Sequence, residues 1–224
     1  MSKAATRRAQ RKVERREAIV DAAARVFEEK GASAATMDDV ADAAEVSKGT
    51  LYLYFSSKDD LFVALTHRPL DVVLARFETL VKDEVDGLTL VQRLIEVHSS
   101  VIHAHATQMR VAFASLCGGF TPDPNTPSLR DYSGRIEQLR ATYVGAIERG
   151  MADGSLRSDL DPDEVAAGLW AGIFGASFIR MNAEHFRASI PGHDAARQLD
   201  TIHLSVAKLL FAAIAAPTKE EAPA

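Results

Sequence analysis

The chain lacks most of the features that mark secreted or membrane-spanning proteins. Cys117 is the only cysteine among 224 residues, which excludes an internal disulfide and suits a reducing cytoplasm. The first residues are charged and contain no apolar run, so we expect no secretory signal. The longest conspicuous uncharged stretch of the C-terminal half, residues 165–179, is shorter than the ~20 residues that span a bilayer. We therefore expect a cytoplasmic protein with no membrane contact.

Patterns that predict catalysis are also missing. The sequence has no nucleophile motif, no phosphate-binding loop and no cluster of metal ligands, and its carboxylates lie mostly on faces predicted to be exposed. The histidines His98, His103 and His105 do not have the i, i+4 spacing that places two imidazoles on one helical face. Nothing cationic adjoins Cys117 in the sequence to favour its thiolate, which disfavours a redox role. We predict no enzyme, no metal site and no cofactor.

Charge is distributed unevenly along the chain. The net charge is −5, yet residues 1–16 carry seven basic residues against Glu14 alone, so the remainder carries −11. We predict that residues 1–15 form a flexible basic arm in which Arg11 and Arg15 contact DNA, along its phosphates or in the minor groove. A solvated helix extension and an amphipathic targeting peptide are the alternatives.

The rest of the chain is predicted to be helical, because no run alternates convincingly between apolar and polar residues. Two loops interrupt it, one at the prolines that follow Gly119 and one over residues 154–162. The fold class is therefore all-α, with about nine helices, and we expect residues 216–224 to form a disordered tail. Beyond the N-terminal part we expect helices near residues 58–84, 88–106, 108–118, 128–153, 162–187 and 194–215.

Residues 36–58 contain three helix-capping signals at short spacing. Thr36, Ser47 and Ser57 each precede a helical segment, and each hydroxyl can accept from the free backbone N–H groups of the first turn. Only Glu45 and Val46 are left for the turn between the first two helices, and so short a connection makes them cross steeply. This is the pattern of a helix-turn-helix, which predicts DNA binding.

The preceding segment supplies the helix that such a head needs. Apolar residues from Ile19 to Phe27 recur at helical spacing, and the helix is expected to end near Gly31, a typical left-handed cap. We predict a three-helix DNA-binding domain over residues 16–58, followed by a larger helical ligand-binding and dimerisation domain over residues 59–215.

The segment from about Arg16 to Leu65 resembles the DNA-binding head of the TetR family of bacterial transcriptional regulators. The run from Ser47 to Phe55 is the specific part of this resemblance. That family commonly has glycine where this chain has Glu45, and a positive φ there would strain a glutamate by on the order of 1 kcal/mol. The matching residues are Ala22, Phe27, Gly31, Thr36, Val40, Ala41, Ala44, Val46, Ser47, Lys48, Gly49, Thr50, Leu51, Tyr52, Tyr54, Phe55, Lys58 and Leu61.

A short recognition helix from Lys48 to Tyr54 is expected to enter the major groove. Thr50 and Leu53 suit thymine methyl groups, and Ser47 or the lysine that follows it lies at the entrance of the helix. Gly49 lets the backbone approach the DNA closely. The resemblance further implies phosphate contacts, a role that suits hydroxyl and ammonium groups, for Thr36, Lys48, Tyr52, Tyr54 and Lys58.

Sequence-specific sites usually require two heads, which read two half-sites of a pseudo-palindrome. The resemblance implies that residues 162–187 and 194–215 form a four-helix interface with a second copy of the chain. The alternative is that these helices close the subunit's own core, and both hold if they use different faces. The predicted interface residues are Leu169, Ile173, Phe178, Leu199, Ile202, Val206 and Leu210.

A ligand pocket is expected mainly among the helices between residues 88 and 150. Apolar and aromatic side chains would form it and polar groups would anchor the ligand, although core packing is the alternative for each residue. Pro69 lies inside the helix expected over 58–84, where it acts as a hinge or ends one helix and starts another. The predicted ligand-binding residues are His98, His105, Met109, Phe113, Cys117, Tyr143, Trp170 and Phe174.

These patterns predict a homodimeric, sequence-specific transcriptional regulator, most simply a repressor. A small lipophilic or aromatic ligand would release it from a pseudo-palindromic operator in double-stranded DNA. The alternative is a DNA-binding architectural or regulatory protein that a protein partner controls.

Overall fold

The computed structural model describes residues 3–119, 121–184, 186 and 193–217. These residues are mostly helical, and within these ranges the only strand-like pairing is an isolated bridge between Leu156 and Ala215. The predicted all-α fold is confirmed. None of the helices in the described ranges is long and apolar enough to cross a membrane. Most of the predicted tail, residues 218–224, lies outside the described residues.

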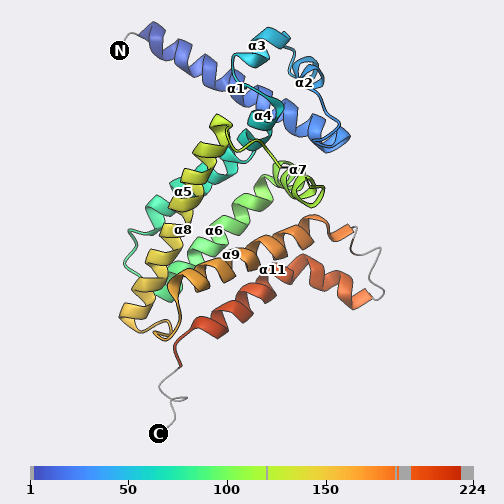
Figure 1. Ribbon diagram of the computed structural model, residues 1–224. Helices are drawn as coiled ribbons and strands as arrows, with labels where there is room; N and C mark the ends of the chain where they lie inside the picture. Colours follow the sequence, from blue (N-terminus) through green and yellow to red (C-terminus); the bar gives the residue numbers. More distant parts are fainter. Residues whose placement is uncertain (1–2, 120, 185, 187–192, 218–224) are drawn as a thin grey trace. The chain divides into compact units, whose positions relative to one another are not determined.

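The chain divides into two compact units, whose helices are labelled in Figure 1. The first contains residues 1–68 and 105–134, and the second contains residues 69–104 and 135–224. The sequence placed the division after residue 58 instead. The first unit is therefore larger than the predicted head, because later segments of the chain join it.

The first unit starts with the long helix α1 (Lys3–Lys30) and three short helices. The three predicted caps are all present, since the hydroxyls of Thr36, Ser47 and Ser57 each accept from the backbone N–H three residues later. The short helices are α2 (Met37–Ala43), α3 (Lys48–Tyr52) and α4 (Lys58–Ala64).

Residues 3–15 continue α1 as a helix and do not form the flexible arm that was predicted. The segment consists mainly of alanine, arginine, lysine, glutamine and glutamate, which have high helix propensity. The side chain of Gln10 also donates to Glu14 one turn later, at 3.1 Å. The helix extension, one of the two alternatives, is what the structure contains.

The core of the first unit forms where the apolar stripe of α1 meets the short helices. Ile19, Leu51, Phe55 and Leu61 are at most 1% exposed. The ring of Phe27 packs against that of Phe62, with centroids 6.0 Å apart. Leu51 and Phe55, which lie in the segment that resembles the TetR head, are therefore core residues.

Two later segments, α7 (Ala106–Cys117) and the start of α8 (Pro127–Asp153), belong to this unit. Arg110 of α7 donates two hydrogen bonds to Glu28 of α1, at 3.0 and 2.6 Å. The buried carboxylate of Asp60 accepts from the backbone N–H of Ser128 at 3.1 Å, and Nε2 of His67 lies 2.9 Å from the Ser128 carbonyl oxygen. Such contacts join residues more than 60 positions apart, so periodicity could not reveal them.

The helix expected over residues 58–84 is two helices, because α4 ends at Ala64 and α5 spans His67–Leu80. Pro69 is the third residue of α5, in the first turn, where a backbone N–H has no partner within the helix. Pro69 therefore helps to start a helix and does not kink a continuous one.

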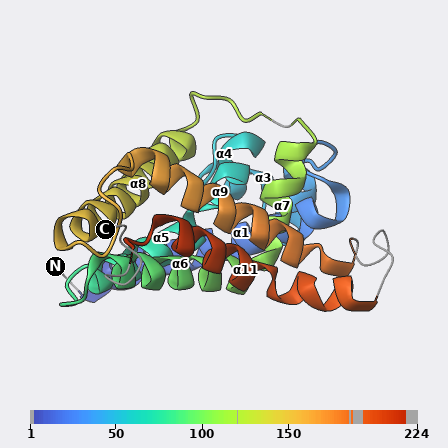
Figure 2. The same cartoon turned by 90° about the horizontal axis from the view of Figure 1, so that it is seen from below.

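The second unit is built from most of α5 and α8 together with α6 (Gly87–Ala104), α9 (Pro162–Met181) and α11 (His193–Ile214). Helices α9 and α11 lie side by side in Figure 1 and Figure 2, and α6 contacts both. Phe77, Leu94, Ile147 and Leu169 are fully buried in this unit.

Candidate nucleic-acid interface and ligand cavity

The turn between α2 and α3 has the geometry of a Schellman helix ending. The backbone N–H of Glu45 donates to the Asp42 carbonyl at 3.1 Å, and that of Val46 donates to Ala41 at 3.0 Å. Glu45 has a φ of +52°, a conformation that no other non-glycine residue adopts in the described ranges. Because a Cβ disfavours this conformation, the strain predicted for Glu45 has a structural basis.

A capping box starts α2. The Thr36 hydroxyl accepts from the Asp39 N–H at 3.1 Å and donates to the Asp39 carboxylate at 2.7 Å. Hydrogen bonds from Lys30 and Thr36 lower the pKa of Asp39 to about 2, so the box is charged at neutral pH. The Thr36 hydroxyl thus takes part in the cap, and the phosphate contact that the resemblance implies for it stays a prediction.

Helix α3 ends at Tyr52, two residues earlier than predicted, and Leu53 forms its C-cap. The Leu53 side chain is 80% exposed. Thr50 is half-buried, and its hydroxyl lies 2.8 Å from that of Ser47. The exposed residues of this element, which we call the recognition surface, are Ser47, Lys48, Gly49, Tyr52 and Leu53.

Gly49 is not required by the packing of the chain. A Cβ at this position would meet only the Ser47 hydroxyl, at 4.0 Å. Gly87 is the opposite case, since a Cβ there would lie 2.1 Å from the backbone nitrogen of Gly150. The open space at Gly49 lies on the recognition surface, where it gives another molecule access to the backbone.

The two lysines predicted to contact phosphates have different surroundings. Lys48 is exposed and lies 2.8 Å from Asp38, whose hydrogen bond raises the pKa of the lysine. Lys58 donates to the backbone carbonyls of Ser33 and Ala35, at 2.9 and 3.0 Å. Lys58 therefore tethers the loop between α1 and α2. An ammonium group has three N–H donors, so the phosphate contact assigned to Lys58 stays a prediction.

The remaining candidates of the first unit lie on its core and on α1. Tyr54 is half-buried and packs against the core. Arg11 and Arg15 are exposed on the N-terminal half of α1. Sequence reasoning missed Arg16, whose guanidinium carbon lies 4.9 Å from the ring centroid of Phe55, a cation–π contact.

The predicted ligand-binding residues are divided equally between the two units. Those of the first unit are His105, Met109, Phe113 and Cys117, of which Met109 is buried and Cys117 is exposed. The other four, in the second unit, form a connected aromatic cluster: His98, Tyr143, Trp170 and Phe174.

This aromatic cluster is uncharged at neutral pH. Nδ1 of His98 lies 3.2 Å from the Tyr143 hydroxyl, and the histidine is only 4% exposed. Burial lowers the pKa of His98 to about 4 and raises the pKa of Tyr143. Edge-on contacts with Phe77 and Phe174 surround the imidazole. The cluster thus offers aromatic surface and one buried polar pair, with the exposed Trp170 at its edge.

A cavity of about 220 Å³ adjoins the cluster between α8 and α9. Arg140 and Asp163, which form an ion pair, contribute its charged groups. Six of its residues were missed from the sequence, since no local signal shows which faces of two helices will meet. The lining residues are Ile136, Leu139, Arg140, Tyr143, Asp163, Ala166, Ala167 and Trp170.

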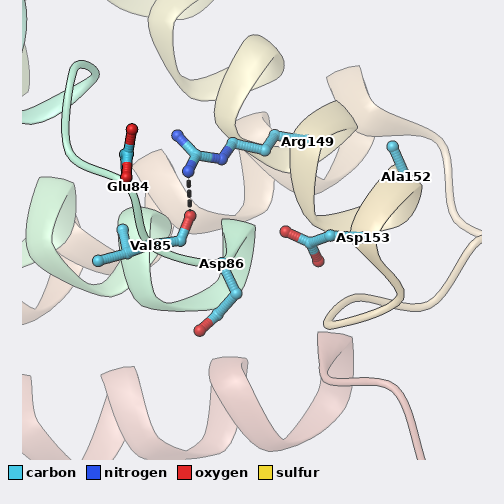
Figure 3. A pocket seen from close by; sticks show the side chains of 6 residues that line it. All are labelled: Glu84, Val85, Asp86, Arg149, Ala152 and Asp153. Carbon is cyan, nitrogen blue, oxygen red and sulfur yellow. Dashed lines mark hydrogen bonds between the residues drawn. The ribbon is translucent and has the colours of Figure 1, made fainter.

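A second hollow, where the α5–α6 loop meets the end of α8, is shown in Figure 3. Arg149 donates to the carbonyls of Asp83 and Val85, and Asp153 accepts from the backbone N–H of Gly87 at 2.7 Å. These polar groups hold the loop against the helix. We assign this hollow a structural role.

The predicted dimer residues mostly pack within this chain. Leu169, Ile173 and Leu199 are buried, and Phe178 and Ile202 are half-buried. Half-buried Val206 and Leu210 approach Gly172 of α9, where a Cβ would lie 3.3 and 2.6 Å from their methyl groups. The buried residues fit the alternative, in which these two helices close the subunit's own core.

A capped three-helix head with an exposed recognition surface defines this chain as a helix-turn-helix DNA-binding regulator. Residues 19–65 match the family described as bacterial regulatory proteins, tetR family. The chain is 30% identical over 151 residues to the HTH-type transcriptional repressor KstR2 of Mycobacterium tuberculosis, covering 67% of this chain and 74% of the relative. The chain belongs to the tetR family.

Solved structures agree with this assignment. The ketosteroid transcriptional regulator KstR2 of M. tuberculosis is 25% identical, with a TM-score of 0.65 over 91% of this chain and 96% of that one. The regulator FadR of Bacillus subtilis, solved with stearoyl-CoA, shares the fold at 20% identity, with a TM-score of 0.67 over 87% and 97% of the two chains. Membership of this family also confirms that the chain is a regulator and not an enzyme.

Proposed function

We propose that this protein is a homodimeric transcriptional repressor that leaves a pseudo-palindromic operator when a small lipophilic or aromatic ligand binds. The observation that carries the DNA-binding part is the recognition surface on α3. Its exposed Ser47 and Lys48 and its protruding Leu53 suit major-groove edges and phosphates. Repression is proposed because KstR2, a relative by sequence, is a repressor.

A second copy of the chain is the proposed partner in the dimer. Leu204 and Leu209 of α11 are 60% and 71% exposed, and Trp170 of α9 is also exposed. Gly168 and Gly175 of α9 have nothing of their own chain within 4 Å of a Cβ position, so another helix could approach closely. These exposed residues are better interface candidates than Leu169, Ile173 and Leu199, which are buried in the chain's own core.

The dimer is tested by Leu204→Glu with Leu209→Glu, followed by light scattering. We expect a monomer that has lost operator binding, because charges oppose burial in an interface. Val81→Glu is the matched control, an exposed apolar residue of the same unit, and should stay dimeric. A monomeric parent protein would refute the dimer.

The proposed ligand site is the cavity beside the aromatic cluster. Its volume of about 220 Å³ lies below the roughly 300–1,000 Å³ of most ligand pockets, so binding requires it to widen. Aromatic walls suit a flat apolar body, and KstR2, described as a ketosteroid regulator, supports a lipophilic effector. The chain's single tryptophan, Trp170, lines this cavity, so its fluorescence should change when the cavity is occupied at constant oligomeric state.

The DNA-binding proposal is tested by selecting random duplexes with the purified protein near physiological salt and sequencing the survivors. An enriched pseudo-palindrome is the expected result, and it supplies the probe for the ligand. Steroid ketones and aromatic acids are then tested for release of the protein from that probe, with the Trp170 signal as a second readout. No enrichment would reduce the function to non-specific DNA binding.

Control by a protein partner is the alternative. It predicts an enriched operator from which none of these small molecules releases the protein. A partner captured on the operator complex, together with an unresponsive Trp170, would favour that alternative.

A further inference from the structure

The N-terminal part of α1 carries four basic side chains on one face. Arg8, Arg11, Lys12 and Arg15 follow the i, i+3, i+4, i+7 spacing that aligns residues along a helix, and all four are exposed. Among the described residues none of the four forms an ion pair with a carboxylate. We call these residues the basic face.

The basic face and the end of the recognition element line the same groove. This groove has a volume of about 1060 Å³ and includes Leu53 and Tyr54 on its far side. Glu14 is its only acidic lining residue, and its carboxylate accepts from Gln10. The groove is therefore strongly positive and adjoins the recognition surface directly.

We propose that this groove binds the phosphate backbone of double-stranded DNA next to the half-site that α3 reads. The inference rests on the proposed DNA-binding function and adds a second contact surface to it. It replaces the flexible arm expected from the sequence with a helical surface, whose backbone is already ordered before binding.

The dimensions of the basic face fit a DNA strand. Seven residues separate Arg8 from Arg15, which corresponds to about 10 Å along a helix axis. One DNA strand carries a phosphate for about every 3.4 Å of duplex axis, so about three phosphates pass this length. The four charges of the basic face are thus enough to neutralise the phosphates that pass it.

The chemistry favours DNA over an anionic membrane. A helix that lies on a membrane presents large apolar side chains opposite its basic face. Between Ala5 and Ala18 the only apolar residue larger than alanine is Val13, so this segment has little to insert into lipid. Leu53 and Tyr54 across the groove belong to the recognition element, which links the groove to DNA.

The test compares the salt dependence of duplex binding for full-length variants. Arg8→Gln, Arg11→Gln and Arg15→Gln together remove three charges and keep good helix formers. Each lost phosphate contact lowers the slope of log K against log salt by about 0.9, so we expect a slope shallower by about three. Near 0.15 M salt the affinity should fall on the order of 100-fold, with the preferred sequence unchanged.

Two further variants separate charge from folding. Arg76→Gln, Lys82→Gln and Lys208→Gln remove the same charge from exposed sites in the second unit and should leave the slope within about one of the parent. Replacing Arg8, Arg11 and Arg15 with lysine keeps the charges and should restore the parental slope. A slope that the glutamine variant leaves unchanged, or that the control lowers equally, overturns the proposal.

Failure of this groove proposal can be distinguished from failure of the proposed sequence-specific function. The slope is measured on any duplex of fixed length, so it tests the groove even if no preferred sequence exists. Leu53→Ala should alter sequence preference while the slope stays parental. Binding to phosphatidylserine vesicles that requires the basic face, with an unchanged slope on DNA, would assign the surface to a membrane and overturn the proposal.

Discussion

The two compact units encode their candidate sites in different ways. In the first unit the recognition surface lies within residues 47–53, which directly follow a tight turn and begin with a helix cap. In the second unit the aromatic cluster joins His98, Tyr143 and Trp170, which come from three helices. A site built from neighbouring residues leaves a readable local signal, whereas a site built by packing does not.

The separation of the two candidate sites is tested most strongly by truncating one buried side chain beneath each site. Leu51→Ala and Leu94→Ala each remove a leucine that is 0% exposed, so each should lower the free energy of unfolding by about 2–5 kcal/mol. Urea denaturation measures both losses. Under conditions where both variants stay folded, we expect Leu51→Ala alone to weaken duplex binding. Equal binding by the two variants would contradict the separation of the sites.

Acid should destabilise the second unit through His98. The folded pKa is about 4 and the unfolded value is 6.5, so below pH 6.5 the unfolded chain binds a proton that the folded chain does not. Stability is therefore complete above pH 6.5 and is lost as the pH falls toward 4, by at most about 3 kcal/mol.

The histidine effect is isolated by the double variant His98→Phe with Tyr143→Phe, which leaves neither partner unpaired. Its unfolding free energy should fall less than that of the parent between pH 6.5 and 4.5. The low pKa of Asp39 in the first unit acts only below its ordinary value of 3.8, so it does not obscure this window. Parallel pH curves would show that His98 is not buried as described.

The capping box of the first unit should make a smaller contribution. Thr36→Ala removes the hydroxyl that accepts from the Asp39 N–H and should cost about 1 kcal/mol. Thr36→Ser keeps the hydroxyl and serves as the control in thermal unfolding. Equal losses in both variants would assign the effect to packing of the threonine methyl and not to the cap.

Substitution in the turn at Glu45 should change the free energy of unfolding least, and it should stabilise the protein. Glu45→Gly relieves the left-handed backbone and should raise the unfolding free energy by about 0.5–1 kcal/mol. Glu45→Ala keeps the Cβ and should give no such gain. If the melting temperature of the glycine variant is unchanged or lower, the strain at this turn is disproved.

Much of the fold was predictable because its signals are local. The caps at Thr36, Ser47 and Ser57 involve residues three apart, and the apolar stripes follow the helical period. The predicted helices near residues 88–106, 128–153 and 194–215 match α6, α8 and α11 to within two residues.

What the sequence did not predict lies where distant segments meet. Lys58 donates to backbone carbonyls more than 20 residues earlier, and these carbonyls have no side-chain signal. Leu169 and Ile173 face the subunit's own core, and the sequence could not show which apolar face is covered. The basic N-terminal segment was predicted to be a flexible arm, but from Lys3 onward it is part of helix α1.

The central claim, that the recognition surface on α3 contacts DNA, is tested most directly by Gly49→Ala. The added Cβ meets only the Ser47 hydroxyl at 4.0 Å, and alanine favours a helix, so the melting temperature should be unchanged or raised. Affinity for the selected duplex should nevertheless fall at least about 10-fold, equal to about 1.4 kcal/mol, because the methyl group occupies the space of close approach. Unchanged affinity in a fully stable variant would contradict the claim.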